Sequence, residues 1–317
     1  MPSTLATLLT TILPLASAQT RSDKRGLVFV PNEETPQDND IWIRDGSDLT
    51  WYYNYGPTPA PAFADKSQDA FEFVPMLWGS IDDTSFLDDV NNLISGGRNI
   101  SHVLTFNEPD GSTQYGGSGI APAKAAQVWV DNIIPLQKKG VAAGLPACTG
   151  ATTGIPWLQE FLGNCSALIS TGGTQTNCSY DFVTLHWYGN FEGLASHMGE
   201  YSAAFPNTSQ WITEYNENDQ ALLETQSFYN TSAEYFDRLS NVARYSYFGA
   251  FRSNVSNVGP NAVMLSNGGA LTDIGSWYLG GVATGVVPQS GFASRMREVG
   301  SGLFAFARAL FVGLLVL

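Results

Sequence analysis

Short apolar stretches recur along the chain, separated by polar or helix-forming segments. Segments such as 121–138 and 231–243 carry apolar residues at helical spacing. Eight stretches have the length and composition of strands: 26–30, 49–55, 71–78, 102–106, 140–145, 181–188, 210–215 and 245–251. Eight alternating strands and helices over about 260 residues are the usual size of a (β/α)8 barrel. The pattern therefore predicts an α/β fold, with one TIM barrel forming a single domain.

The amino-terminal end falls outside this pattern. An apolar run over residues 5–15 ends in Ala-Ser-Ala at 16–18, the small-residue pattern that signal peptidase cleaves. Residues 1–18 are therefore predicted to be a signal peptide. A short pro-segment or linker over 19–25 then leads into the barrel domain, which is expected to span 26–287.

The carboxyl-terminal end, residues 288–317, joins a polar spacer to an apolar tail over 303–317. This layout is that of a signal exchanged for a glycosylphosphatidylinositol (GPI) anchor, and the tail is short for a membrane span. The alternative is a terminal amphipathic helix packed on the domain. The tail thus predicts either a lipid anchor to the membrane or one more helix.

The acidic composition narrows the choice of partners. A net charge of -14 and an isoelectric point near 4.4 argue against nucleic acids and anionic membrane surfaces, which call for clustered lysine and arginine. The 8 Trp, 13 Tyr and 18 Phe suit a protein that stacks aromatic rings on sugar rings. We expect a monomer with a carbohydrate partner.

Three cysteines fit an oxidising compartment. Cys165 and Cys178 bracket a polar, glycine-rich segment, which favours a disulfide that closes this loop. Cys148 is then a free thiol at the end of an apolar strand. Three buried thiols are the alternative.

Six N-glycosylation sequons support secretion, because chance would leave roughly half as many among the asparagines of this chain. Their asparagines are Asn99, Asn164, Asn177, Asn207, Asn230 and Asn254. Together with the signal peptide they predict a secreted or cell-surface glycoprotein.

The stretch "LTFNEPD" places Asn107 and Glu108 directly after an apolar strand. A turn is the simplest interpretation, because the residues on both sides of Glu108, namely Asn107 before it and proline, aspartate and glycine after it, are turn formers. In a barrel, however, the carboxyl ends of the strands carry the active site. Glu214, in "WITEYNEND", lies 106 residues further on, about three strand–helix units, so the two carboxylates would face the same opening. Glu214 has the strand parity of Ile212, and an inward Ile212 would place Glu214 inward as well.

Two further strand ends carry candidate binding residues. "LHWYG" puts His186 and Tyr188 on one face of the sixth strand, beside Glu214. The histidine is either a satisfied core residue or a hydrogen-bond partner of Glu214 or of a sugar hydroxyl, and the tyrosine could orient Glu214. Trp78 ends "FVPMLWG" as a stacking platform or as packing at the rim.

Other chemistries lack their motifs. The three histidines do not have HExxH spacing and the chain has no CxxC, so we expect no metal site. A Walker loop, a GxGxxG after a strand and a GxSxG nucleophile elbow are also missing, and no cofactor is expected.

Five motifs together carry a family resemblance. "KRGL", "PMLWG", "LTFNEPD", "DFVTLHWYG" and "WITEYNEND" occur in this order. They resemble the glycosyl hydrolase domain of the alkali-sensitive linkage protein type, glycoside hydrolase family 128 of clan A, over about residues 26–287. Cys148 departs from the family pattern, in which a small or hydroxyl residue is expected. The resemblance implies a retaining endo-β-1,3-glucanase or a related β-glucan-binding wall protein, usually fungal.

The resemblance also implies roles for the two carboxylates, with Glu108 as the acid/base and Glu214 as the nucleophile. Retention requires Glu214 to be ionised while Glu108 holds its proton. Hydrogen bonds from His186 and Tyr188 are expected to keep the pKa of Glu214 low. Asn107 is suited to bind the 2-hydroxyl of the sugar. A non-catalytic wall lectin, an endo-mannanase and a β-1,6-glucanase remain alternatives on the same barrel.

The sequons generate a testable prediction. The secreted protein should run well above its polypeptide mass on a denaturing gel and shift down after treatment with an N-glycosidase, because attached glycans add mass. The same chain made in the bacterial cytosol, where the sequons stay bare, is the control. The absence of a shift would contradict the secretory interpretation.

Overall fold

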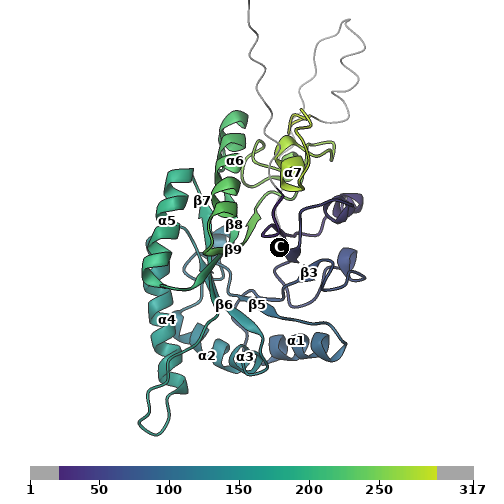
Figure 1. The fold of residues 1–317 in the computed structure, drawn as a ribbon. Coiled ribbons are helices and arrows are strands. Elements are labelled where there is room, and N and C mark those ends of the chain that lie inside the picture. Colours follow the sequence, from purple (N-terminus) through teal and green to yellow (C-terminus); the bar gives the residue numbers. More distant parts are fainter. Residues whose placement is uncertain (1–20, 291–317) are drawn as a thin grey trace, which may run out of the picture.

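Parallel strands form the centre of the computed structural model, which describes residues 21–290 (Figure 1). The strands are β1 (Gly26–Val28), β2 (Trp51–Tyr53), β3 (Glu72–Phe73), β4 (Met76–Leu77), β5 (His102–Thr105), β6 (Ala142–Cys148), β7 (Phe182–Tyr188), β8 (Ser209–Asn216) and β9 (Val242–Tyr247). Hydrogen bonds order them as β1-β2-β3 and as β4-β5-β6-β7-β8-β9, and every pairing is parallel.

The two sheets join into one ring. β3 and β4 both come from the predicted strand 71–78, which Pro75 interrupts because it has no N–H to donate. The carbonyl of Pro75 still accepts a hydrogen bond from the Leu104 amide of β5, at 2.9 Å. At the other seam Arg25, next to β1, forms a parallel bridge with Tyr245 of β9. The eight predicted strands thus close into a (β/α)8 barrel, which confirms the predicted fold class.

Seven α-helices of the described chain lie along the outside of the strands (Figure 1). They are α1 (Ser85–Ser95), α2 (Pro122–Asn132), α3 (Ile134–Gln137), α4 (Gly154–Ile169), α5 (Phe191–Ala204), α6 (Leu222–Arg238) and α7 (Asp273–Tyr278). The helix predicted over 121–138 is present as α2 and α3, with a break before Pro135. The prediction of a helix over 231–243 is partly wrong, because α6 ends at Arg238 and β9 begins at Val242.

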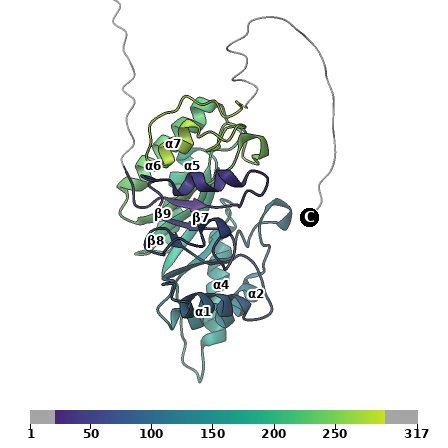
Figure 2. The ribbon, with the colours of Figure 1, turned by 90° about the vertical axis from the view of Figure 1, so that its right-hand side faces the viewer.

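The first two units carry no α-helix, which corrects the expectation of a helix in each unit. Short 3-10 helices stand in their place, η1 (Pro36–Ile43) and η2 (Pro61–Phe63). These connections are rich in prolines, which cannot donate helical hydrogen bonds: Pro31, Pro36, Pro57, Pro59 and Pro61. η1 runs across the front of the molecule below α7 (Figure 2), and there Asp38 receives two hydrogen bonds from Arg252, at 2.6 and 2.9 Å.

Apolar side chains form two separate core layers. One consists of residues from the strands and their junctions, Val28, Trp51, Tyr53, Val74, Met76, Leu104, Phe182 and Trp211. The other joins the opposite strand faces, including Ile212, to helix residues such as Met198 and Phe228. Because successive strand residues point to opposite faces, the first layer fills the barrel and the second lies beneath the helices.

The predicted disulfide between Cys165 and Cys178 is present and links the end of α4 to the segment before β7. Cys148, the last residue of β6, is a buried free thiol, as predicted. The sequon asparagines differ in exposure: Asn99, Asn177, Asn207 and Asn254 are exposed, whereas Asn164 and Asn230 are half-buried within α4 and α6. The exposed four are the better acceptors for glycosylation.

The signal peptide predicted over 1–18 and the apolar tail over 303–317 lie outside the described residues. Within residues 21–290, every helix is too short or too polar to cross a bilayer.

A charged cluster lies near the amino ends of β3, β5 and β9. Glu72 accepts hydrogen bonds from Arg244 at 2.6 Å and from Ser101 at 3.1 Å, and it lies 3.0 Å from Nδ1 of His102. Burial opposes the ionisation of Glu72, but the hydrogen bonds from His102 and Arg244 outweigh it and hold its pKa at about 2. The guanidinium of Arg244 also lies 4.3 Å from the ring centre of Trp211.

This cluster predicts acid-sensitive stability. The folded-state pKa of Glu72, about 2, lies below the ordinary 4.5, so its stabilisation is complete above that ordinary value and is lost as the pH falls towards 2. Glu72→Gln should therefore lower the free energy of unfolding by about 3 kcal/mol at neutral pH, and by progressively less in acid. Urea unfolding across this pH range measures the difference. Glu234→Gln, at an exposed position of α6, is the control. A cost for Glu72→Gln that does not change with pH would contradict this account.

Candidate active site

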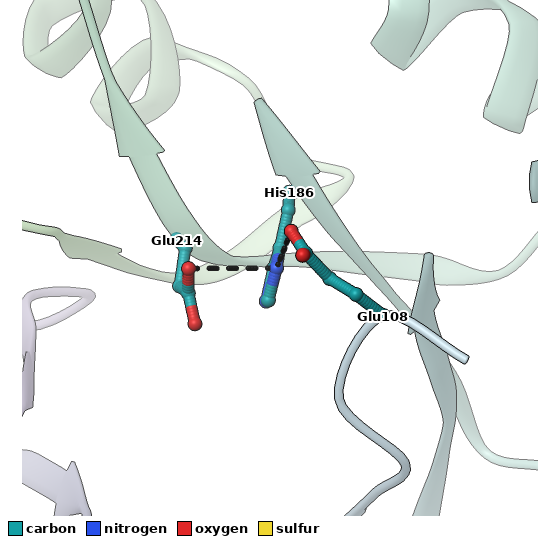
Figure 3. Close-up of side chains that lie close together, drawn as sticks. All are labelled: Glu108, His186 and Glu214. Carbon is teal, nitrogen blue, oxygen red and sulfur yellow. Dashed lines mark hydrogen bonds and ion pairs between the residues drawn. The ribbon is translucent and has the colours of Figure 1, made fainter. Parts of the chain in front are cut away.

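The carboxyl ends of the strands surround a cavity of about 430 Å³. Five of the residues singled out from the sequence line it, Trp78, Asn107, Glu108, Tyr188 and Glu214. The remaining lining residues are Val30, Tyr55, Tyr115, Gly116, Asn218, Phe248, Asn257 and Val258. His186 does not line the cavity but lies against both glutamates, as Figure 3 shows. The structure thus brings all six predicted site residues together.

Glu214 reaches the cavity because β8 has an irregular register. Leu185 of β7 pairs with Ile212, yet the next residue, His186, pairs with Glu214. Thr213 is therefore an extra residue, which reverses the alternation of faces. The sequence argument placed Glu214 inward on the condition that Ile212 points inward, and this condition does not hold, because Ile212 packs in the layer beneath the helices. Glu214 faces inward through the bulge.

Glu108 is held in an uncommon backbone conformation, with φ of 43°. This left-handed region costs a non-glycine residue on the order of 1 kcal/mol and persists only where the surroundings enforce it. The Glu108 amide donates to the Ala147 carbonyl of β6 at 2.7 Å, and the Gly111 amide donates to the Glu108 carbonyl at 2.9 Å. Gly117 packs so closely on this turn that a Cβ there would lie 2.8 Å from the Glu108 carbonyl oxygen. The segment is a turn, as the simplest interpretation held, and it also presents the carboxylate to the cavity.

His186 lies between the two carboxylates. Its Nδ1 is 3.0 Å from Oε1 of Glu108 and 3.6 Å from Oε2 of Glu214. The sequence argument paired it with Glu214 or with sugar, whereas its hydrogen bond goes to Glu108. Burial would lower the pKa of His186, but the negative charges of Glu214 and Glu108 outweigh burial and raise it. This environment favours the imidazolium form.

Two tyrosine hydroxyls hold Glu214 in place. Tyr188 donates to Oε2 and Tyr55 to Oε1, each at 2.6 Å. The orienting role considered for Tyr188 agrees with this contact. Tyr55 was missed by the sequence reasoning, although it ends the predicted strand 49–55 and thus lies at the barrel mouth. Its position at a strand end was the available signal.

The pKa of Glu214 is raised, contrary to the expectation from the sequence. Burial raises it, the charge of Glu108 adds to this, and His186, Tyr188 and Tyr55 only partly offset the rise. The net shift is upward, whereas hydrogen bonding was expected to keep this pKa low. Desolvation of a deeply buried carboxylate is the larger effect here.

Asn107 and the aromatic residues offer contacts to a ligand. The side-chain amide of Asn107 donates to the Gly116 carbonyl at 3.0 Å, while its Oδ1 is buried and has no partner among the described residues. That oxygen is a hydrogen-bond acceptor without a protein partner. Trp78 and Tyr115 line the cavity with 38% and 81% of their surfaces exposed, so both offer aromatic surface to a ligand, and a stacking role for Trp78 stays a prediction.

The ligand atoms of Glu108, His186 and Glu214 all lie within 4.8 Å of one another. That distance would admit a metal ion, although both oxygens of Glu214 already accept phenol hydrogen bonds. The absence of a metal stays a prediction. For two carboxyl groups acting on a glycosidic bond, such a separation matches the retaining arrangement of about 5 to 5.5 Å rather than the inverting one, in which a water molecule must fit between them.

Comparisons with known proteins identify the family of the chain. Residues 26–278 match the family model of the glycosyl hydrolase catalytic core. The chain is 28% identical over 265 residues to alkali-sensitive linkage protein 1 of Schizosaccharomyces pombe, an alignment that covers 81% of this chain and 44% of that protein. The chain thus spans less than half the length of this curated relative.

Two solved structures of glycoside hydrolase family 128 share the fold. An endo-β-1,3-glucanase of subgroup II from Pseudomonas viridiflava is 24% identical, with a TM-score of 0.65 and coverage of 84% of this chain and 100% of that one. An oligosaccharide-binding protein of subgroup VII from Cryptococcus neoformans is 23% identical, with a TM-score of 0.59 and coverage of 83% and 96%. With the family model, they confirm the resemblance to family 128.

The contacts of Glu214 predict the effect of removing one donor. Tyr55→Phe should raise the pKa of Glu214 further, because the carboxylate loses one of two phenol hydrogen bonds that favour its charged form. Carbon NMR titration of glutamate-labelled protein measures this pKa. Tyr115→Phe, at the rim of the same cavity, is the matched control. An unchanged or lower pKa in Tyr55→Phe would show that this hydrogen bond does not stabilise the carboxylate.

Proposed function

Because the chain belongs to the glycosyl hydrolase catalytic core family, we propose that it is a retaining endo-β-1,3-glucanase that acts on cell-wall glucan. The observation that carries this proposal is the pair of glutamates at the barrel mouth, whose oxygens lie within 4.8 Å of each other and of His186. The relationship to a β-1,3-glucanase of the same fold supports the substrate class.

Two steps of chemistry follow from the arrangement. Glu214 attacks the anomeric carbon, the bond from that carbon to the leaving oxygen breaks, and Glu108 donates its proton to that oxygen. Glu108 then removes a proton from water, and the water oxygen displaces Glu214 from the sugar. The second step returns to Glu108 the proton that the first step removed, so the two steps together regenerate both glutamates without a cofactor.

The surrounding residues act on these two groups. Tyr55 and Tyr188 orient the nucleophile, because each donates to a different oxygen of Glu214. His186 shares its charge between the glutamates and so lets Glu214 carry a negative charge in a buried position. Asn107 offers its unpartnered Oδ1 to a sugar hydroxyl, a contact that gains strength as charge develops in the transition state.

The second candidate is a β-glucan-binding wall protein without hydrolytic activity. The observation that favours it is the similarity to an oligosaccharide-binding protein on the same barrel. Cleavage of another β-linked polysaccharide would need only different loops around the mouth. In either case the proposed location is the cell wall or cell surface, on the strength of the predicted signal peptide and sequons.

Substitution of the two glutamates distinguishes their roles. Glu214→Gln should abolish turnover of every substrate, because the covalent route is lost. Glu108→Ala should be nearly inactive on β-1,3-glucan, yet it should regain activity on an activated aryl glycoside when azide is added. An activated leaving group needs no proton, and azide attacks the glycosyl-enzyme without a general base. Initial rates by reducing-sugar and chromophore release measure both effects.

Glu160→Gln, at an exposed position of α4, is the matched control and should retain full activity. Glucan binding by Glu214→Gln should persist, since the aromatic lining is unchanged. If wild type binds linear β-1,3-glucan but cleaves no glycoside from mildly acidic to neutral pH, the binding protein is the correct assignment.

A further inference from the structure

The bulge in β8 leaves a buried backbone carbonyl outside the regular strand pairing. Thr213, the extra residue of the bulge, has no paired residue in β7 or β9, two strands that the structure describes in full. Thr213 is buried, with 2% of its surface exposed. A buried carbonyl needs a hydrogen bond, because leaving it without one costs about as much as losing a hydrogen bond. Strand pairing alone therefore does not fix the position that turns Glu214 towards the cavity.

Two side-chain hydroxyls donate to the Thr213 carbonyl. Tyr53 of β2 donates to it at 2.9 Å, and Ser246 of β9 donates to it as well. Both residues are fully buried. A carbonyl oxygen has two lone pairs, so these donors can fill both of them. The bulge is thus held by its neighbour β9 and also by β2, which pairs with β1 and β3 and not with β8.

Tyr53 also supports the side chain of the nucleophile. Its ring meets the ring of Tyr55 edge-on, with centres 5.2 Å apart, and the Tyr55 hydroxyl donates to Oε1 of Glu214 at 2.6 Å. Tyr53 itself does not line the cavity of about 430 Å³. It therefore acts on Glu214 at two points, the carbonyl of the preceding residue and the phenol that binds the carboxylate, without reaching the space for a sugar.

We propose that Tyr53 is a positioning residue that holds the β8 bulge through the Thr213 carbonyl and thereby directs Glu214 at the anomeric carbon. Ser246 is the second donor in the same role. A slip of β8 by one residue would turn Glu214 to the opposite face of the strand. Even a small displacement slows attack, because the reacting atoms must be close and aligned. This inference rests on the proposed hydrolase reaction.

The test compares Tyr53→Phe with a matched control, Tyr247→Phe. Tyr247 is also fully buried and donates to a backbone carbonyl at 2.9 Å, that of Ala262, but it packs in the layer beneath the helices. Both variants lose one buried hydrogen bond, so both should lower the midpoint of thermal unfolding. Tyr53→Phe alone should lower kcat on linear β-1,3-glucan, by about tenfold, and should change KM by less than about twofold, because the cavity lining is intact.

Ser246→Ala removes the other donor and gives an independent measurement. Each single substitution leaves one hydroxyl on the Thr213 carbonyl, whereas Tyr53→Phe combined with Ser246→Ala leaves neither of them. The fold-loss of kcat in the double variant should therefore exceed the product of the two single losses. Losses that simply multiply would overturn the shared role of the two hydroxyls. Ser246→Ala also replaces Tyr53→Phe in every measurement if thermal unfolding shows that the phenylalanine variant is not folded.

A second readout does not need turnover. In Tyr53→Phe the displaced Glu214 should lose part of its hydrogen bonding from Tyr55 and Tyr188, so its pKa should rise, as carbon NMR titration measures. The nucleophile must be ionised to attack, so the acid limb of the pH profile of kcat/KM should move to higher pH. Tyr247→Phe should leave the pKa and the pH profile unchanged.

The outcomes separate this inference from the proposed function. Tyr53→Phe that loses stability as Tyr247→Phe does, with kcat and the pKa of Glu214 as in wild type, would show that Tyr53 only packs the barrel, and it would overturn the proposal. Failure of wild type to cleave any β-glucan would reject the proposed function instead. The NMR titration still tests the positioning of Glu214 in that case, because a rise in its pKa in Tyr53→Phe alone supports the contact.

Discussion

The carboxylates of Glu108 and Glu214 lie within 4.8 Å of each other and of the His186 imidazole. The barrel wall around them excludes most water, so their charges are weakly screened. Like charges at this distance favour protonation of one partner, and burial strengthens that tendency. The imidazole between them and the two phenols on Glu214 oppose it. The strained turn at Glu108 and the bulge in β8 serve this arrangement, because each aims a carboxylate at the same histidine.

The residues of the site could be located from the sequence, but their contacts could not. A carboxylate placed after an apolar strand is visible as a motif, and the barrel topology brings strand ends together. The orientation of Glu214 was derived from the parity of Ile212, which a one-residue bulge invalidates. No local pattern reveals a bulge. Tyr55 contacts Glu214 across 159 residues of sequence, so only the closed ring shows that it belongs to the site.

The strands of the fold could be predicted from the sequence, but the connections of the first two units could not. The eight strands follow from apolar runs, because burial on both faces of a parallel strand leaves few polar positions. The missing helices of the first two units were overlooked, since the regular spacing of strands was taken to imply a helix in every gap. Proline-rich connections at 57–61 show the limit of this rule, as a residue without an N–H cannot sustain a helix. The burial that sets the pKa of Glu214 depends on the assembled barrel, not on neighbours in the sequence.

The ring closes between β1 and β9, so the barrel can be completed only late in the synthesis of the protein. The bridge between Arg25 and Tyr245 joins residues 220 positions apart. A ribosome makes the chain from its amino terminus, so β1 emerges long before its second neighbour exists. One edge of β1 must then stay unpaired until residues 242–247 have been made, and an unpaired strand edge can template pairing with a foreign chain. The nascent barrel is therefore open to misassembly for nearly the whole time of its translation.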